Sequence, residues 1–246
     1  MRTAIKLAVL GQLPPDFDYR KLLKWKSSVF HLSDTVESFE LNKSAQGTDW
    51  EYTDKQLKPY LTERFDEDLM LILVKIKLEQ NWYVRRLSGN RVIFSFFEIA
   101  EILRSNGIPL HNVVLRVLYA YTLVYKRYKN RIPLISEHTD YAHDETRGCL
   151  FDMNPSKWDV VYSCDSPKIC QHCVSVLRDQ QVSLELIDDV SNEIKRIKKP
   201  LYYRITDFII QHPVWSLMIS LGTALGIGIV SSIIGAFIYK ALEHKP

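Results

Sequence analysis

Glycine, proline and cysteine are scarce in this chain, which has 9, 10 and 4 of them among 246 residues. Such low numbers exclude a collagen-like repeat, a disordered Gly- or Pro-rich chain and a disulfide scaffold. A net charge of +3 and a mean hydropathy of −0.12 also exclude a polytopic transporter and a generally basic protein that coats nucleic acid. These averages alone describe an ordinary chain that is long enough to bury a core.

The longest stretch without charge lies near the C-terminus, where residues 208–239 contain no Asp, Glu, Lys or Arg. At about 1.5 Å per residue, a helix over residues 214–239 is about 39 Å long, which exceeds a hydrocarbon core of about 30 Å. Trp215 and Tyr239 lie at its two ends, where aromatic rings favour the headgroup level. We therefore predict a transmembrane helix over residues 214–239 and a short tail over 240–246; a buried core helix is the less favoured alternative.

Basic residues are concentrated on one side of this apolar segment. They are Lys195, Arg196, Lys198, Lys199 and Arg204, and only Lys240 and Lys245 follow the segment. Such a bias favours a single-pass protein of the inner (plasma) membrane whose N-terminal body stays in the reducing cytosol. The apolar run over residues 5–10 is too short for a secretory signal. We expect the five preceding basic residues to contact anionic lipid headgroups.

Small residues recur within the predicted span. Ala224, Gly228, Ser232 and Ala236 follow one another every four residues, and Gly222 and Gly226 form a GxxxG pair on a neighbouring stripe. Because small residues let helix backbones approach closely in lipid, this pattern predicts self-association in the membrane. The alternative is glycine that is merely tolerated.

The remaining pattern predicts an α+β body with a mixed sheet. We expect strands over residues 4–10, 69–78 and 91–97, and helices over 20–26, 98–104, 110–128 and 174–199. The domains predicted are an α/β body over 1–174 with a Cys/His segment at 138–173, then a connecting helix and basic segment over 175–213. A basic and aromatic patch at Trp82, Tyr83, Arg85, Arg86 and Arg91 is read as a hairpin surface, with contact to nucleic acid as the alternative.

All four cysteines fall between residues 149 and 173, and three histidines, His138, His143 and His172, lie within or shortly before this stretch. Cys170 and Cys173 have the CxxC spacing that lets two thiolates bind one tetrahedral zinc ion. A redox CxxC at a helix N-terminus and inert buried thiols remain as alternatives. With two further cysteines and a histidine nearby, this spacing predicts a zinc site.

The segment from His143 to Cys173 resembles the end of the archaemetzincin signature, HExxHxxGxxHC-x4-C-x17-C-x2-C. His143 falls on its third histidine and Asp144 on its first cysteine, while Cys149, Cys170 and Cys173 fall on the remaining cysteines. The resemblance covers about residues 69–180 and implies a zincin-like fold with zinc. On this resemblance we predict a structural zinc site formed by Cys149, Cys170 and Cys173, with His143 as the fourth ligand and Cys164 as its competitor. We expect His138 and His172 to be solvated or to lie next to the ligands rather than to bind the metal. The gap between Cys149 and Cys170 is 20 residues in this chain and 17 in the family pattern.

This chain departs from that family where catalysis would reside. The two catalytic histidines would fall on Pro133 and Glu137, and no HExxH occurs anywhere in the sequence. Zinc hydrolysis needs two histidines on a helix and a glutamate that activates the bound water. The motifs GxSxG, GxxxxGK[ST] and GxGxxG are absent as well. We therefore predict a degenerate, non-enzymatic zinc domain; an active metallopeptidase is the less favoured alternative.

The layout of a cytosolic zinc body and one C-terminal span resembles the effector membrane proteins of bacterial antiphage systems, in particular retrons. This resemblance implies a toxin that a partner complex of reverse transcriptase and its RNA or DNA keeps silent. Its release on infection would let the transmembrane helices assemble and disrupt the inner membrane. The competing hypothesis is a membrane-tethered zinc-binding scaffold or adaptor, and neither reading expects a small-molecule substrate.

Overall fold

A computed structural model describes residues 2–61, 64–144 and 146–243 of the chain. The chain divides into two compact units, Met1–Lys199 and Pro200–Pro246. The first unit therefore extends beyond residue 174, where the sequence favoured a boundary. Met1, Glu145 and residues 244–246 of the predicted tail lie outside the described residues.

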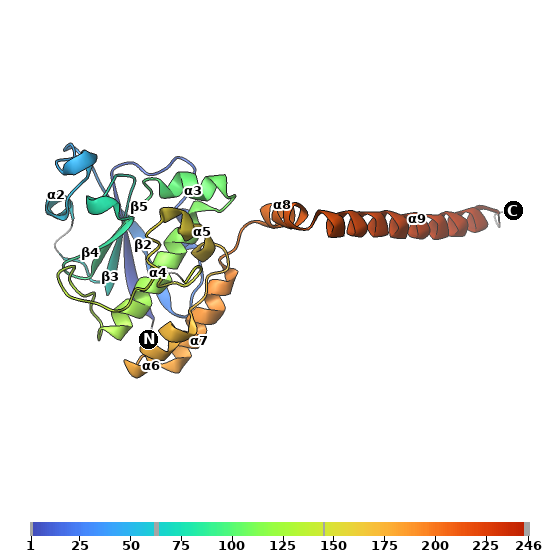
Figure 1. The fold of residues 1–246 in the computed structure, drawn as a ribbon. Helices are drawn as coiled ribbons and strands as arrows, with labels where there is room; N and C mark the ends of the chain where they lie inside the picture. The colour runs from blue at the N-terminus through green and yellow to red at the C-terminus, as the bar shows by residue number, and fades with distance from the viewer. Residues whose placement is uncertain (1, 62–63, 145, 244–246) are drawn as a thin grey trace. The chain divides into compact units, whose positions relative to one another are not determined.

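A five-stranded mixed sheet forms the centre of the first unit (Figure 1). Its strands are β1 (Thr3–Leu10), β2 (Phe30–Phe39), β3 (Leu69–Val74), β4 (Val84–Leu87) and β5 (Arg91–Ser95). The order across the sheet is β2-β1-β3-β5-β4, in which β4 alone of these strands runs antiparallel to its neighbour. The α+β body with a mixed sheet is thus confirmed.

The central strand β3 is buried on both faces of the sheet. Leu69, Leu71 and Leu73 enter the larger core, whereas Met70, Ile72 and Val74 enter the smaller core on the opposite face. This alternation follows from the two-residue period of a strand, and a continuous apolar run is typical of a strand covered on both sides.

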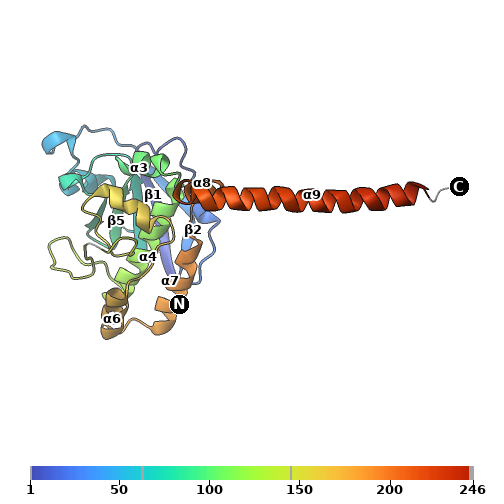
Figure 2. The same ribbon diagram turned by 45° about the vertical axis from the view of Figure 1, so that its right-hand side comes forward.

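Helices cover the sheet mainly on the side of the larger core. In this unit they are α1 (Arg20–Leu23), α2 (Asp54–Leu57), α3 (Ile99–Ser105), α4 (Leu110–Arg127), α5 (Val160–Ser163), α6 (Gln171–Asp179) and α7 (Leu184–Glu193). Short 3-10 turns occur at Thr48–Trp50, Lys58–Tyr60, Glu79–Asn81, Lys157–Asp159 and Ile194–Arg196. Figures 1 and 2 show α4 lying along the sheet, with α6 and α7 near one of its ends. Sixteen of the 18 residues of α4 are buried, which makes it the central helix of the body.

The prediction of one helix over residues 174–199 is wrong, because the chain forms two helices in this region. α6 ends at Asp179, Gln181 takes a positive φ of 63°, and the Ser183 side chain caps the start of α7 by accepting from the Leu186 amide. Leu177, Val182, Ile187, Val190, Ile194 and Ile197 from this region are buried in the larger core. These helices are therefore part of the body, rather than a stalk beside it.

The strand predicted over 69–78 ends at Val74, and two strands were missed. β4 has only four residues, two of which are arginines. β2 lies at the edge of the sheet and carries polar side chains, and its register against β1 shifts so that Ile5 faces Leu32 while Leu7 faces Val36. The extra residues in β2 form an irregularity of the bulge type, which increases the local twist of a strand.

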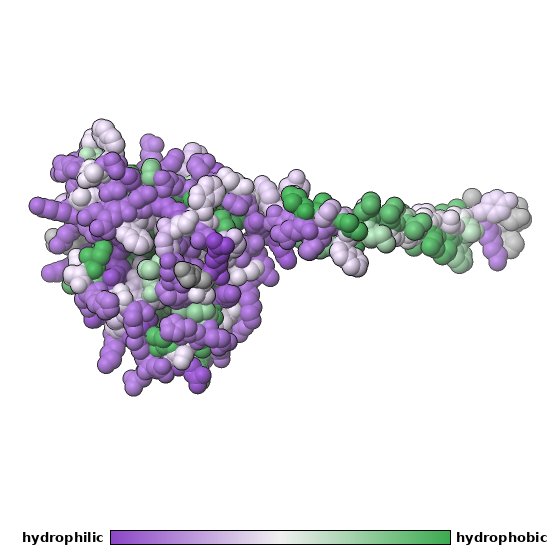
Figure 3. Space-filling view, in the orientation of Figure 1, coloured by the Kyte–Doolittle hydropathy of each residue, from purple (hydrophilic) through white to green (hydrophobic). Residues whose placement is uncertain are grey.

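The second unit consists of two consecutive helices, α8 (Leu201–Gln211) and α9 (Pro213–Glu243). His212 between them leaves the helical conformation, with φ −133° and ψ 61°. One helix that is long and apolar enough to cross a membrane, Pro213–Lys240, is present in the described part of the chain, and none of it is buried. Figure 3 shows the apolar colour along α9 and a mostly hydrophilic surface on the visible face of the body.

Candidate metal centre

Three separate segments meet at the site of the predicted zinc ligands. The His143 amide donates to the Phe151 carbonyl oxygen at 3.0 Å, and the Met153 amide donates to the His143 carbonyl at 2.9 Å. The Leu150 amide donates a hydrogen bond to the Lys168 carbonyl oxygen at 2.9 Å, and the Lys168 amide donates to the Gly148 carbonyl oxygen at the same distance. Backbone hydrogen bonds therefore fix each ligand-bearing segment against the next.

Local structure explains how the ligands turn inward. Gly148 has a φ of +85°, and a Cβ atom at this position would lie 3.3 Å from the Tyr162 carbonyl oxygen, so the turn before Cys149 needs glycine. Cys170 is the N-cap of α6, and its sulfur accepts from the Cys173 amide at 3.4 Å. The helix start thus places the two CxxC sulfurs on the same side.

The structure brings together His143, Cys149, Cys170 and Cys173, whose ligand atoms all lie within 4.8 Å of one another. His143 Nε2 lies 3.3 Å from Cys149 Sγ and 3.5 Å from Cys170 Sγ, and Cys149 Sγ lies 3.8 Å from Cys173 Sγ. Ligands at about 2.3 Å from a tetrahedral zinc ion are separated by about 3.8 Å, and a thiolate and an imidazole by slightly less. The spacing fits such an ion.

The electrostatics of this cluster favour thiolate formation at Cys149. A hydrogen bond between the Cys149 and Cys173 sulfur atoms lowers the pKa of Cys149 below its usual range and raises that of Cys173. Cys149 and Cys173 are buried, whereas His143 and Cys170 are half-buried. A cation at the centre of the cluster would compensate the buried negative charge.

The donor set is that of a structural zinc site, in which protein groups occupy all four positions. The four residues can hold a metal ion, and three thiolates with one imidazole suit zinc better than they suit magnesium or calcium, which prefer oxygen. Bound zinc would supply folding free energy and would join the three segments around it.

The other sulfur and histidine candidates lie outside this cluster. Cys164 is fully buried, and burial raises the pKa of its thiol to about 12. His138 and His172 are exposed, and the His172 ring packs edge-on against His143 with 6.3 Å between centroids. The CxxC does begin a helix, but the described residues before it form a loop rather than a strand of the sheet.

The two positions at which the family resemblance would place catalytic histidines have other roles. Pro133 is buried, and Glu137 forms a two-pronged ion pair with Arg131 at 2.8 Å for both contacts. The Arg131 guanidinium holds the pKa of Glu137 far below its usual range. Neither residue is positioned as a metal ligand in the cluster described above.

The predicted lipid-contacting residues differ in their surroundings. Arg196 stacks over the Trp25 ring at 4.5 Å and donates to the Lys26 carbonyl at 2.7 Å, so the body already occupies its guanidinium. Lys195 donates to the Asn192 side chain, whereas Lys198 is exposed in the first unit and Arg204 in the second. The Lys199 amide donates to Asp165.

The small residues of α9 face open space in the second unit. Gly222, Ala224, Gly226, Gly228, Ser232 and Ala236 are all exposed. A Cβ atom added at Gly222, Gly226 or Gly228 would meet nothing within 4 Å. The stripe therefore remains available for a helix outside this unit.

The predicted basic and aromatic patch does not form one surface. Arg85 is buried and forms an ion pair with Asp54 at 2.6 Å, and Tyr83 is buried as well. Arg91 lies over Phe65 and donates to the Ser88 carbonyl. Contact with nucleic acid through these residues as a group is therefore disfavoured.

Comparisons with known proteins add a likeness to a solved structure. No family model matches the chain, and no curated protein matches it in sequence. The chain is similar to the crystal structure of archaemetzincin from Methanopyrus kandleri, with 14% identity and a TM-score of 0.43 over 73% of this chain and 95% of that one. At that score the two backbones follow each other loosely, and the likeness says nothing of activity.

Sequence reasoning missed a cavity of about 320 Å³ whose walls include β4 and α4. Its polar residues include Tyr83, Arg86, Arg116 and Tyr141. The sequence signal that could have indicated the cavity is Arg116, a charged residue among the apolar, core-facing positions of the helix over 110–128.

Proposed function

We propose that this protein is a membrane-anchored effector of a bacterial antiphage system that acts by disrupting the inner membrane through α9. The observation that carries the proposal is the segment Pro213–Lys240, 28 residues that are apolar, without acidic residues and not buried. At about 1.5 Å per residue, it is about 42 Å long and exceeds the hydrocarbon core with room for tilt. A helix of this kind in water would expose a large apolar surface, which lipid would cover.

The basic residues on the N-terminal side of the span support a location of the body in the cytoplasm. Basic residues precede the span, and we propose that Lys195, Lys198 and Arg204 contact anionic headgroups at about 1 kcal/mol each. α8 supports an attachment at the interface, because Tyr203, Ile205, Phe208 and Ile209 are exposed on this short helix. Such amphipathic helices lie in the headgroup region of a membrane.

The proposed action is assembly of several α9 helices in the membrane. The stripe of small residues would let the helices approach closely, and a breach would follow when enough copies associate. A complex of reverse transcriptase with its RNA or DNA is the proposed inhibitor, and the metal centre serves to keep the body folded rather than to catalyse a reaction.

The test is expression in bacteria while membrane potential and growth are recorded. The wild-type chain, expressed without a partner, should collapse the potential, and Gly228→Leu should restore it because a larger side chain blocks close helix approach. Ile227→Leu is the matched control, since it lies next to Gly228 outside the small-residue stripes and should remain toxic. Unchanged potential and growth with the wild-type chain would refute the proposal.

A membrane-tethered scaffold is the second candidate, and the cavity beside α4 favours it because an anchored binding module needs a recognition site. Replacement of residues 214–239 by an unrelated single-pass anchor separates the two functions. A scaffold keeps its function after this exchange, whereas the effector loses its toxicity.

A peptidase is disfavoured by the helix that borders the cavity. Within α4, which the structure describes in full, the residues that line the cavity are Arg116, Val117, Ala120, Tyr121 and Val124. This face offers no histidine or glutamate to bind a catalytic metal or to activate water. We therefore propose that the body recognises or regulates rather than hydrolyses.

A further inference from the structure

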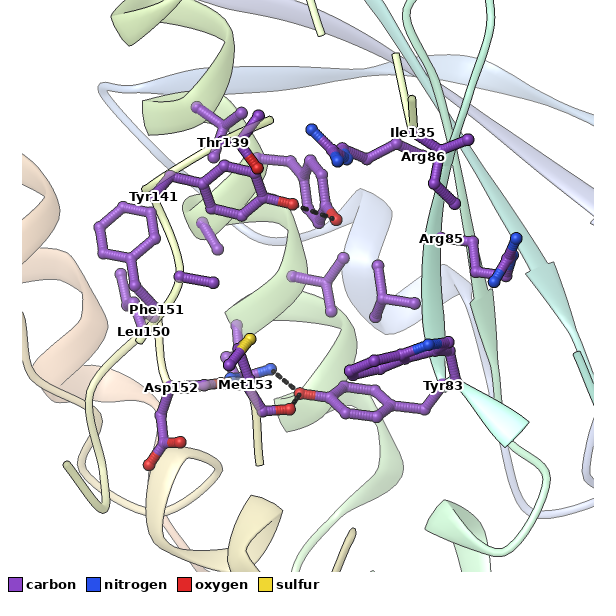
Figure 4. Close-up of a pocket in the computed structure, with 18 of the residues that line it drawn as sticks. Tyr83, Arg85, Arg86, Ile135, Thr139, Tyr141, Leu150, Phe151, Asp152 and Met153 are labelled. Atoms are coloured by element: carbon purple, nitrogen blue, oxygen red, sulfur yellow. Dashed lines mark hydrogen bonds between the residues drawn. The ribbon is translucent and has the colours of Figure 1, made fainter. Parts of the chain in front are cut away.

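The cavity beside α4 is lined by residues from the sheet, the helix and the loops around the metal centre (Figure 4). Its volume of about 320 Å³ falls in the range of small-molecule sites. Trp82 and Ile135 line it and are 38% and 48% exposed, so the cavity is open to solvent beside them. A small molecule therefore has both a space and an entrance.

Arg116 is a buried cation at one wall of this cavity. Its side chain comes from the middle of α4, and the residue is 4% exposed. Its Nη1 donates to the Tyr83 hydroxyl at 3.1 Å and its Nη2 to the Asp152 carbonyl oxygen at 2.8 Å, while Nε has no hydrogen-bond partner. Among the described residues it forms no ion pair, although burial of a lone charge costs several kcal/mol.

Arg86 supplies a second guanidinium from β4. Figure 4 shows its side chain reaching toward Tyr141, and its Cζ lies 5.4 Å from the centre of that ring. Its Nη1 is buried and, in the described part of the chain, has no hydrogen-bond partner. Two arginines that line the same cavity thus each have one buried donor without an acceptor.

The other charged residues of the cavity are already engaged. Arg85 turns away from Arg86 in Figure 4 and binds Asp54. The Asp152 carboxylate accepts from the Asn154 amide at 3.0 Å, and in Figure 4 it points away from Arg86 and Tyr141. With Arg85 paired to Asp54, the remaining charged residues of the lining are Arg86, Arg116 and Asp152, and their charges sum to a positive value.

Rings and aliphatic groups form the remaining walls. Tyr83, Tyr121, Tyr141 and Phe151 contribute rings, and the Tyr121 and Tyr141 hydroxyls lie 3.4 Å apart. Burial raises the pKa of Tyr121 well above its usual value, so its hydroxyl stays protonated and can donate. Flat apolar bodies are bound well by such rings, and guanidinium groups bind carboxylate and phosphate oxygens.

The chain segments that carry metal ligands also form two walls of the cavity. Tyr141 and Ala142 directly precede His143, and Leu150 follows Cys149. The backbone pairing of His143 with Phe151 and Met153 joins the two segments between the cluster and the cavity. The cavity is therefore preformed where the metal ligands are in place, which reduces the entropy cost of binding.

We propose that this cavity binds a small organic anion, whose phosphate or carboxylate group is held by Arg86 and Arg116 and whose flat ring lies among the tyrosines. The site is independent of the effector function, because it requires neither the span nor toxicity. A bound anion would give Arg116 Nε and Arg86 Nη1 the acceptors that they lack.

Calorimetry on the full zinc-loaded chain in detergent micelles tests this proposal. The probes are phenyl phosphate, AMP and phenylacetate, compared with the uncharged benzyl alcohol and adenosine and with inorganic phosphate. We expect at least one of the three organic anions to bind at micromolar to millimolar concentration, about tenfold or more tightly than its uncharged counterpart or than inorganic phosphate. Tight binding of phenylacetate but not phenyl phosphate assigns a carboxylate, and the reverse assigns a phosphate ester.

Arg86→Gln should weaken that binding by about tenfold or more, because it removes one charged donor from a half-buried position. Arg178→Gln, an exposed arginine on α6, is the matched control and should bind as the wild type does. Thermal unfolding of both variants verifies that they fold. Absence of binding by all three anions, equal binding of the uncharged probes, or wild-type affinity in Arg86→Gln would each overturn the proposal.

Discussion

The two units of this chain bury the same kinds of side chain in opposite ways. Ile93 in β5 has no exposed surface, whereas Ile229 in α9 is 62% exposed, although both lie in regular secondary structure. In the body, strands and helices cover one another's apolar faces, while α9 is apolar on all sides and has no covering partner in its own unit. The difference teaches that the two units suit different surroundings: the body buries its apolar groups away from water, whereas α9 has the apolar surface that the proposed membrane would cover.

Loss of a metal ligand should break this comparison most strongly, because it acts on one unit alone. Cys149→Ala removes a buried ligand of the cluster, and we expect the body to lose more than about 4 kcal/mol of unfolding free energy. Near-UV circular dichroism and bound zinc should fall together, while the helical signal of α8 and α9 in detergent persists.

Cys164→Ala is the matched control, since Cys164 is equally buried and lies outside the cluster. It should cost about 1 kcal/mol through lost packing and should retain one equivalent of zinc. Equal losses in the two variants, or full zinc content in Cys149→Ala, would contradict a structural site at these four residues.

A matched pair of isoleucine substitutions tests the different surroundings of the two units directly. Ile93→Ala should lower the unfolding free energy of the body by about 2–5 kcal/mol, because it leaves a cavity in the smaller core. Ile229→Ala should leave the unfolding of the body unchanged, since its side chain touches no core. Denaturant unfolding in detergent, followed by tryptophan fluorescence, measures both, and a comparable loss for Ile229→Ala would contradict the division into two units.

The smallest effect concerns Glu193, which ties α7 to the rest of the body. Its carboxylate accepts from the Ser28 amide at 2.6 Å and from the Tyr119 hydroxyl at 2.5 Å. Burial raises the pKa of Glu193, but the hydrogen bonds lower it more, so its net pKa lies below the usual value. Glu193→Gln should cost about 1 kcal/mol at neutral pH, a value reduced by partial exposure to solvent.

The sign of the pH dependence follows from the lowered pKa. The ionised form is stabilised by folding, so the advantage of the wild type over Glu193→Gln is complete above the unfolded pKa of about 4.3. It should decline as the pH falls through the lower pKa of the folded state. Denaturant unfolding at pH 7 and at pH 3 measures the difference, and an advantage that is the same at both values would show that Glu193 stabilises by packing alone.

Sequence patterns predicted the elements whose signals are local. The apolar runs of β1 and β3 and the helical period of α4 arise from burial on a fixed geometry, so they are visible without the fold. β2 and β4 were missed because edge strands carry polar residues, and only their neighbours in space make them strands.

The candidate metal ligands show the same limit of prediction from sequence, because contacts between distant segments decide them. Spacing placed Cys170 and Cys173 together, but the choice between His143 and Cys164 depended on how the loop after α4 folds back. The cavity was not predicted for a similar reason, since Arg86 and Arg116 are 30 positions apart and meet only because β4 and α4 line the same cavity in the folded chain. Long-range packing, rather than any local propensity, determines both sites.

The irregular edge strand β2 has a consequence for copies of this protein that would meet on a membrane surface if the chain is anchored as proposed. Confinement to two dimensions raises the frequency of encounters, and an open strand edge is a template for cross-strand polymerisation. The register shift around residues 33–35 twists the edge, and the exposed Asp34 adds a repulsive charge there. The bulge thus opposes the joining of two copies through their sheets.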